Sequence, residues 1–129
     1  MLYAAPVQLN LATHFLDTRR SEGLGDRIAI RTDRDTLSYS DVIALSARCA
    51  HALSAVDVRP EERVILALRD GPMFVAALFG ILRAGAVVVM VNPDLQPEAL
   101  RYFFEYSRAR VAFVDAARRE VFRQAAAPR

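Results

Sequence analysis

Few side chains in this sequence are of types that do chemistry, and their spacing does not assemble a reactive centre. The chain has two histidines and one cysteine, and all seventeen basic residues are arginine, so chemistry that depends on lysine is excluded. His14 and His51 fall in different predicted helices, with no cysteine or carboxylate at the spacing of metal ligands. We therefore predict that both histidines are structural and bind no metal.

Two other candidates are interpreted in the same way. Cys49 lies on the apolar stripe of a predicted helix, which favours a buried, inert thiol, since a reactive thiolate needs an electropositive and partly open setting. Asp70 follows a predicted strand, where a phosphoacceptor carboxylate could stand, but the lysine that usually accompanies such a site is missing. We predict that Asp70 is a turn residue or a helix cap.

Nucleotide-binding motifs do not match either. A dinucleotide site requires Gly-x-Gly-x-x-Gly after the first strand, whereas the turn at residues 69–72 has one glycine, and a phosphate-binding loop requires clustered glycines and a lysine. Aromatic residues at 102–106 are predicted to pack in the core through Phe103 and Phe104, with a ligand-stacking platform as the alternative. Four scattered arginines are predicted to be solvated: Arg69, Arg83, Arg101 and Arg108. The sequence thus predicts no catalytic, cofactor-binding or metal-binding residue.

The bulk composition indicates an ordinary globular protein. A chain of 129 residues is the size of one domain, and 53% hydrophobic with 25% charged residues is typical of an α/β protein. The net charge of +2 is spread among acidic residues, which argues against a nucleic-acid partner. One cysteine excludes an internal disulfide, and neither a signal peptide nor an apolar run of about 20 residues is visible. We expect a cytoplasmic protein with no membrane partner.

The elements that must position any site are arranged around residues 83–93. A helix is predicted to end at Gly85, because glycine enters the left-handed conformation without a steric penalty. Residues 87–91 form an apolar run without alternation, which predicts a strand buried on both faces, and Asn92-Pro93 ends it. Such a strand requires helices above and below it.

The segment before this centre is predicted to hold a helix, a hairpin and a longer helix. Asn10 is predicted to cap the first helix, with Leu11, Phe15 and Leu16 facing inward. Residues 27–32 alternate as a half-buried strand, with Ile28 and Ile30 on one side, and residues 36–39 return as its partner. Ser40 is predicted to cap the longer helix, whose apolar stripe comprises Val42, Leu45, Cys49, Ala52, Leu53 and Val56.

From residue 63 onward strands alternate with helices, which predicts parallel strands joined by crossovers. A strand at residues 64–68 precedes a helix that begins at Pro72, and Gly80 in that helix predicts a close backbone approach. The predicted core face of this helix comprises Val75, Leu78, Phe79 and Leu82. Another helix begins at Pro97 with Leu100 inside, residues 111–114 form a strand, and Asp115 is expected to cap a last helix. The predicted fold class is α/β: a parallel sheet flanked by helices, preceded by a helix and a β-hairpin.

Several segments resemble the amino-terminal part of the adenylate-forming superfamily of acyl- and aryl-CoA ligases. Residues 37–42 (LSYSDV) are similar to the early Leu-Thr-Tyr-x-Glu-Leu signature, and residues 71–86 (GPMFVAALFGILRAGA) and 89–93 (VMVNP) continue the likeness in order and spacing. Residues 10–17 and 102–107 are most similar to the benzoate-CoA ligase branch, which includes anthranilate-CoA ligases. The resemblance covers essentially the whole chain.

This resemblance implies a two-step reaction that uses ATP, Mg²⁺ and coenzyme A. An aromatic carboxylate would attack the α-phosphate to give an acyl-adenylate and pyrophosphate, and the thiol of coenzyme A would then displace AMP. In the family the phosphate loop with its lysine, the acidic ribose contact and the catalytic lysine of the small mobile domain all follow the part that this chain matches. Asp94 stands where some aryl-CoA ligases have an arginine that meets a coenzyme A phosphate, so no functional residue is carried over; Arg101, on the following helix, is an alternative cation.

We therefore expect residues 1–129 to be the amino-terminal part of the large AMP-binding domain of an aryl-CoA ligase, without the rest of that domain and without the small carboxy-terminal domain. Alone it is predicted to be inactive and to bind none of the cofactors tightly; its partners are an aromatic carboxylate in the full-length protein and the remainder of its own chain. One alternative is a stand-alone binding or interaction module, which would be polar all round. The other is part of a fatty-acyl or amino-acid adenylating enzyme.

Overall fold

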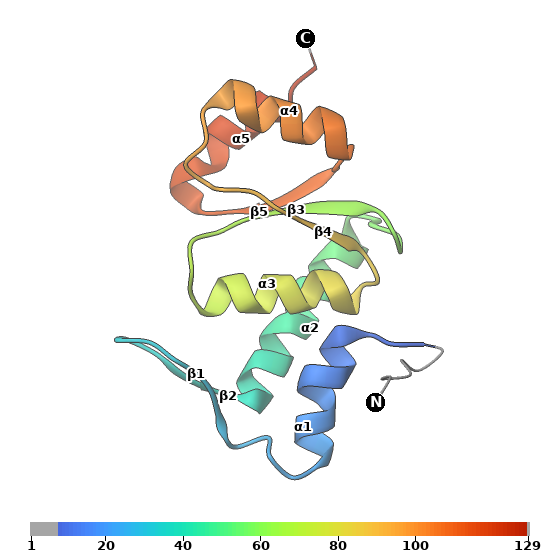
Figure 1. Cartoon of the computed structure of the whole chain (residues 1–129), viewed down its shortest axis with the longest axis vertical. Helices are drawn as coiled ribbons and strands as arrows, with labels where there is room; N and C mark the ends of the chain where they lie inside the picture. Colours follow the sequence, from blue (N-terminus) through green and yellow to red (C-terminus); the bar gives the residue numbers. More distant parts are fainter. Residues whose placement is uncertain (1–7, 129) are drawn as a thin grey trace, which may run out of the picture.

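The computed structural model describes residues 8–128 and shows a mixed α/β fold (Figure 1). In chain order the elements are the π-helix η1 (Thr13–Asp17), α1 (Thr18–Ser21), β1 (Ile28–Arg31), β2 (Thr36–Ser38), α2 (Tyr39–Ala55), β3 (Arg63–Ala67), α3 (Pro72–Arg83), β4 (Val87–Met90), α4 (Pro97–Ser107), β5 (Val111–Val114), the 3₁₀ helix η2 (Ala116–Arg118) and α5 (Arg119–Ala126). Strands β1 and β2 form an antiparallel hairpin, and β4, β3 and β5, in that order, form a parallel sheet. The predicted fold class is confirmed.

Strand β3 is the centre of the sheet, and β4 is not. Because β3 pairs with β4 on one edge and with β5 on the other, Val64, Ile65 and Leu66 are 1% exposed or less. Strand β4 pairs with β3 alone among the described residues, and its Val87 and Met90 are 45% and 58% exposed. The prediction that residues 87–91 are buried on both faces was therefore wrong: an edge strand has a neighbour on one side, and an apolar run looks the same in either place.

Helices cover both faces of the parallel sheet, as the alternation of strands and helices predicted (Figure 1). On one face α3 and α2 pack against Val64 and Leu66 of β3. On the other face α4 and α5 bury Leu100, Phe122 and Ala125 against Ile65 and Ala67 of β3. The two faces of one strand thus serve two separate clusters, because successive side chains of a strand point to opposite sides.

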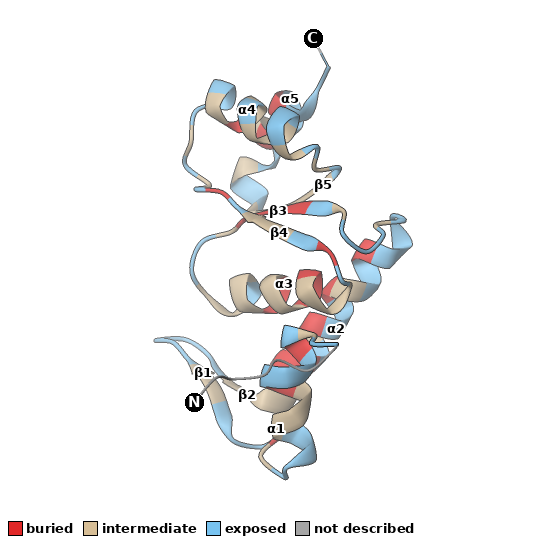
Figure 2. Ribbon diagram, turned by 45° about the vertical axis from the view of Figure 1, so that its right-hand side comes forward, coloured by how far each residue is buried: buried red, intermediate tan, exposed pale blue. Residues whose placement is uncertain are grey.

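Helix α3 begins where predicted but buries a different face. Gly71 is the N-cap residue and Pro72 the first helical residue. The buried side chains are Ala76, Ala77 and Ile81, together with the backbone at Gly80, whereas the predicted core residues Val75, Leu78, Phe79 and Leu82 are half-buried. The difference arises because α3 lies between the sheet and α2 (Figure 2). Its larger apolar residues are therefore divided between two clusters, one on each side of the helix, and none of them is fully buried.

Gly80 marks a close approach of α2 and α3, which confirms the prediction from sequence. A Cβ atom at residue 80 would lie 3.0 Å from the carbonyl oxygen of Ser46 and would overlap the Cβ atom of Cys49. The helix ends at Gly85, whose φ of +72° is the left-handed conformation expected there.

Helix α2 starts two residues earlier than predicted. Ser38 is the N-cap residue: its hydroxyl accepts a hydrogen bond from Asp41 N at 3.1 Å, and the Asp41 carboxylate accepts one from Ser38 N at 2.8 Å. This capping box lowers the pKa of Asp41, mainly through the hydrogen bond from the Ser38 backbone. The predicted stripe is confirmed at Val42, Cys49 and Leu53, but Ala52 and Val56 are exposed.

The amino-terminal helical segment begins at Asn10, as predicted. The Asn10 side chain accepts a hydrogen bond from Ala12 N at 3.0 Å. The π-helical turn η1 then changes which residues face inward: Ala12 and Leu16 are buried, whereas Leu11 and Phe15 are 40% and 53% exposed. The inward positions predicted for Leu11 and Phe15 were wrong, because the prediction assumed ordinary α-helical spacing.

In the hairpin, β1 has an irregularity in its pairing between Ile28 and Ile30. A bulge of this kind disturbs the simple alternation of a strand. Ile30 packs against the cluster around Val42, but Ile28 is 50% exposed, so the prediction that both isoleucines lie on one side did not hold.

A partly buried ion pair fastens the amino-terminal segment to α3. The two Nη atoms of the Arg83 guanidinium donate to the Asp17 carboxylate at 2.8 Å, and the Asn10 amide donates to Leu82 O at 2.8 Å. The hydrogen bond from Arg83 lowers the pKa of Asp17. Arg83 was predicted to be solvated; instead its side chain is only 23% exposed.

Candidate functional site at the carboxyl edge of the parallel sheet

The carboxyl ends of β3, β4 and β5 lie at one edge of the sheet, where ligands commonly bind in open α/β folds. The turns that leave this edge carry its polar residues, which are Arg69, Asp70, Asn92, Asp94, Asp115 and Arg118. This edge is the candidate site, because three separate turns meet there.

Arg69 connects the turn after β3 to both neighbouring turns. Its guanidinium donates to Asp94 Oδ1 at 2.8 Å, and its backbone N–H donates to Asp115 Oδ2 at 3.2 Å. Both members of the Arg69–Asp94 pair are more than half exposed, so this ion pair contributes at most about 1 kcal/mol. Asp115 was predicted to cap the last helix; instead η2 precedes α5, and the Asp115 side chain makes no cap hydrogen bond.

Arg118 holds the turn after β4 in place. Its Nε donates to Pro93 O and its Nη2 to Leu95 O, both at 2.8 Å. The side chain of Asn92 also accepts a hydrogen bond from Asp94 N at 2.9 Å. Sequence reasoning missed Arg118, because backbone carbonyls that accept its hydrogen bonds carry no signal in the side-chain pattern.

The edge is built to hold three turns in register. Arg69 and Arg118 share this edge with Asp70, Asp94 and Asp115, and both guanidinium groups donate to protein oxygens. Asp70 is an exposed turn residue rather than the cap, a role that Gly71 takes. Among residues 8–128 no group of three or more His, Cys, Asp or Glu side chains is placed to hold a metal ion.

The remaining candidates lie elsewhere. Cys49 is buried, and burial raises the pKa of its thiol, which agrees with the prediction of an inert residue. His14 lies edge-on to Phe15, with ring centroids 4.9 Å apart, and His51 is exposed on α2. The structure thus places the two histidines on different helices.

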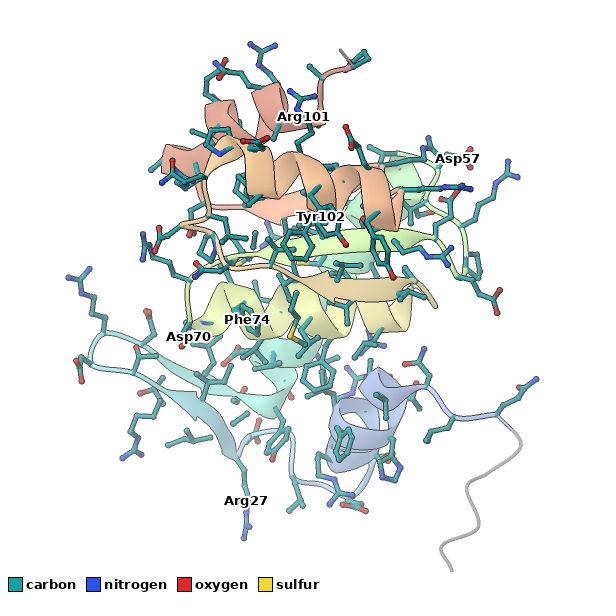
Figure 3. The ribbon with its side chains drawn as sticks, turned by 45° about the horizontal axis from the view of Figure 1, so that its top comes forward. Arg27, Asp57, Asp70, Phe74, Arg101 and Tyr102 are labelled. Carbon is teal, nitrogen blue, oxygen red and sulfur yellow. The ribbon has the colours of Figure 1, made fainter. Side chains whose placement is uncertain are left out.

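Helix α4 carries two exposed tyrosines, of which Tyr102 is labelled in Figure 3. Tyr102 and Tyr106 are exposed and stacked, with ring centroids 5.6 Å apart, while Phe103 and Phe104 pack towards the sheet, as predicted. Arg101 donates to Ala127 O at 2.6 Å and to Gln124 O. This guanidinium therefore supports the end of α5.

Fold and edge together define a doubly wound α/β layer of the type on which nucleotide-using enzymes are built. The family model of the AMP-binding enzymes matches residues 18–128. The chain belongs to the AMP-binding enzyme family.

Its relatives include ligases of aromatic acids. The chain is 36% identical over 118 residues to a 4-hydroxybenzoate–CoA/benzoate–CoA ligase of Rhodopseudomonas palustris, which covers 92% of this chain and 22% of the relative. Among solved structures it is similar to a benzoate CoA ligase from Burkholderia xenovorans LB400, with a TM-score of 0.84, 29% identity, and coverage of 92% of this chain and 24% of that one. An anthranilate CoA ligase in complex with anthranoyl-AMP also matches, with a TM-score of 0.84, 26% identity, and coverage of 92% and 23%.

These comparisons confirm the resemblance to the benzoate and anthranilate branch. The chain spans about a fifth of the length of the curated relative it matches. Within residues 8–128, none of the helices has both the length and the apolar character to cross a membrane.

Proposed function

We propose that this chain is the amino-terminal part of the large AMP-binding domain of an aryl-CoA ligase of the benzoate or anthranilate type. The observation that carries the proposal is the similarity to a benzoate-type CoA ligase over 92% of the chain. The complete enzyme would join an aromatic carboxylate to the α-phosphate of ATP with release of pyrophosphate. The thiol sulfur of coenzyme A would then bond to the acyl carbon as the bond to AMP breaks.

In this proposal the chain supplies the scaffold and none of the reacting groups. Strand β3 with its two helical layers forms one wall of the domain, and the contacts of Arg69 and Arg118 fix the turns at the carboxyl edge. ATP, Mg²⁺ and coenzyme A would bind mainly to the rest of the enzyme, so we propose that residues 1–129 alone are inactive. A single cysteine is consistent with work in the reducing cytoplasm.

The test is pyrophosphate exchange by the purified complete polypeptide that carries this chain. We expect exchange of labelled pyrophosphate into ATP with benzoate, hydroxybenzoates or anthranilate as the acid. A long-chain fatty acid and a neutral amino acid serve as matched alternative substrates. Exchange that depends on either of these and not on an aromatic acid would contradict the proposal and favour another adenylating enzyme.

A further inference from the structure

An apolar hollow lies on the side of α3 that faces away from the parallel sheet. Helices α1 and α2 and the β1–β2 hairpin lie below α3 in Figure 1, with the sheet above it. The hollow between these lower elements and α3 has a volume of about 240 Å³, and Val75 and Phe79 of α3 line it together with Leu16 and Val42. None of the polar residues of the carboxyl edge belongs to its lining, so the hollow is distinct from that site.

The lining of this hollow is chemically uniform. Among the described residues that form it none is charged, and the hydroxyl of Tyr39 is its one polar side-chain group. Three aromatic rings, those of Phe15, Tyr39 and Phe79, take part, and the remaining side chains are aliphatic. Such a lining offers water few hydrogen-bond partners, so an apolar molecule that displaces the water gains the free energy of buried apolar surface.

Two irregularities of the backbone border the same hollow. The π-helical turn η1 contributes the buried Leu16 and also Phe15, which is 53% exposed. In the hairpin, the step from Ile28 to Ile30 covers two residues of β1 but only one residue of β2, so Ala29 is the extra residue of a bulge. Ala29 and Ile30 both line the hollow. Since π-helical turns and β-bulges are both frequent at functional sites, their meeting at one hollow favours a binding site over a packing defect.

The volume and the rings of the hollow indicate the class of ligand. A cavity of about 150 Å³ lined by leucine, isoleucine and phenylalanine is large enough to hold benzene. The volume of about 240 Å³ therefore suits one aromatic ring with a small substituent. Phe15, Tyr39 and Phe79 can meet such a ring edge to face, which stabilises it beyond the burial of its area. A carboxylate in the hollow would lose water without gaining a cationic partner, which disfavours a charged ligand.

We propose that this hollow binds a neutral molecule with a single aromatic ring. The bound ring covers part of the exposed surface of Phe15 and bridges η1 to α3 through Phe79. This inference does not depend on the proposed function. The aromatic carboxylate that a complete ligase would activate is the charged form that the hollow disfavours.

The first test compares toluene with benzoate, which carry a methyl group and a carboxylate group on the same ring. Each is titrated into the 129-residue chain with labelled methyl groups, and the NMR shifts are followed. We expect saturable binding of toluene with a dissociation constant of about 1 mM or lower, and binding of benzoate that is at least about tenfold weaker. Nuclear Overhauser effects from toluene should reach the methyl groups of Leu16, Ile30, Val42 and Val75. No saturable binding of toluene, contacts with other residues instead, or equal affinity for benzoate would overturn the proposal.

The second test fills the hollow with a side chain. Ala29→Phe places a ring in the lining, whereas the matched control Ala47→Phe places the same ring at an exposed position of α2 outside the lining. Because two rings cannot share this volume, Ala29→Phe should weaken toluene binding at least about tenfold, and Ala47→Phe should leave it within about twofold. Toluene should also raise the melting midpoint of the wild type and of the control. Unchanged affinity in a folded Ala29→Phe protein would contradict the site, and if this variant does not fold, the contacts of toluene in the wild type decide the matter.

Discussion

Gly80→Ala tests the helix contact on which the scaffold depends. A methyl group at residue 80 would lie 3.0 Å from Ser46 O and 3.2 Å from Ala50 N, and would overlap the Cβ atom of Cys49. These neighbours are the backbone and the first side-chain atom of α2, so they cannot move aside unless the two helices separate. Substitution of glycine by alanine within a helix otherwise stabilises by about 1 kcal/mol.

The expected result is a net loss of stability. Overpacking of a filled core costs about 1–3 kcal/mol, and rigid neighbours place this site at the upper end of that range. After subtraction of the gain in helix propensity, Gly80→Ala should lower the free energy of unfolding by about 2 kcal/mol. The assay is urea unfolding of the 129-residue chain, followed by circular dichroism at neutral pH.

Variants at Cys49 identify the cause. Cys49→Ala keeps the Cβ atom and should not rescue Gly80→Ala, whereas Cys49→Gly removes that atom and should rescue it in part, because the Ser46 and Ala50 backbone contacts persist. We expect the double variant with Cys49→Gly to lose less stability than the sum of the single variants, by about 1 kcal/mol. A Gly80→Ala protein as stable as the wild type or more stable would refute the close approach of α2 and α3.

Three further predictions concern contacts that hold the scaffold. Asp17→Asn should lower the free energy of unfolding by about 1–3 kcal/mol at neutral pH. Because the folded state lowers the pKa of Asp17, the contribution of its carboxylate is present above the unfolded pKa of about 3.9 and disappears as the pH falls through the lower folded value. The urea midpoints of variant and wild type should therefore converge in acid and remain apart at pH 7. Ser38→Ala should lower the free energy of unfolding by about 0.5–2 kcal/mol, whereas Ser40→Ala should lower it by less than about 0.5 kcal/mol. Equal losses of stability in thermal melts would argue against Ser38 as the N-cap residue. Arg118→Ala should lower the free energy of unfolding by about 1.5–3 kcal/mol. Arg118→Lys should not restore the lost stability, because an ammonium group cannot reproduce the two fixed hydrogen bonds. Full recovery of stability in the lysine variant would contradict this geometry.

Local signals in the sequence predicted the parts of the fold that depend on neighbours in the chain. Asn10 could be recognised as a cap from its residue type, and Gly85 as a helix end from its freedom to adopt positive φ. The placement of Pro72 at the start of α3 followed from its fixed φ and missing N–H. The close approach at Gly80 could be predicted because a glycine that weakens a helix needs a packing reason.

Features set by distant partners could not be predicted in this way. Whether residues 87–91 form a central or an edge strand depends on pairing with strands elsewhere, and Val87 is exposed for that reason. The ion pair between Asp17 and Arg83 joins residues 66 positions apart, and each looks like an ordinary surface charge by itself. Likewise, Arg118 binds carbonyl groups of a turn that is 23 to 25 residues away.

Calorimetric titration of the 129-residue chain with ATP, with and without Mg²⁺, tests the central claim most directly. Adenylation requires fixed positive charge and backbone amides around a triphosphate, and the arginines at the carboxyl edge already donate to protein oxygens. We predict no saturable heat at millimolar ATP under either condition. Tight, Mg²⁺-dependent binding of ATP by this chain would contradict the view that it is a scaffold without reacting groups.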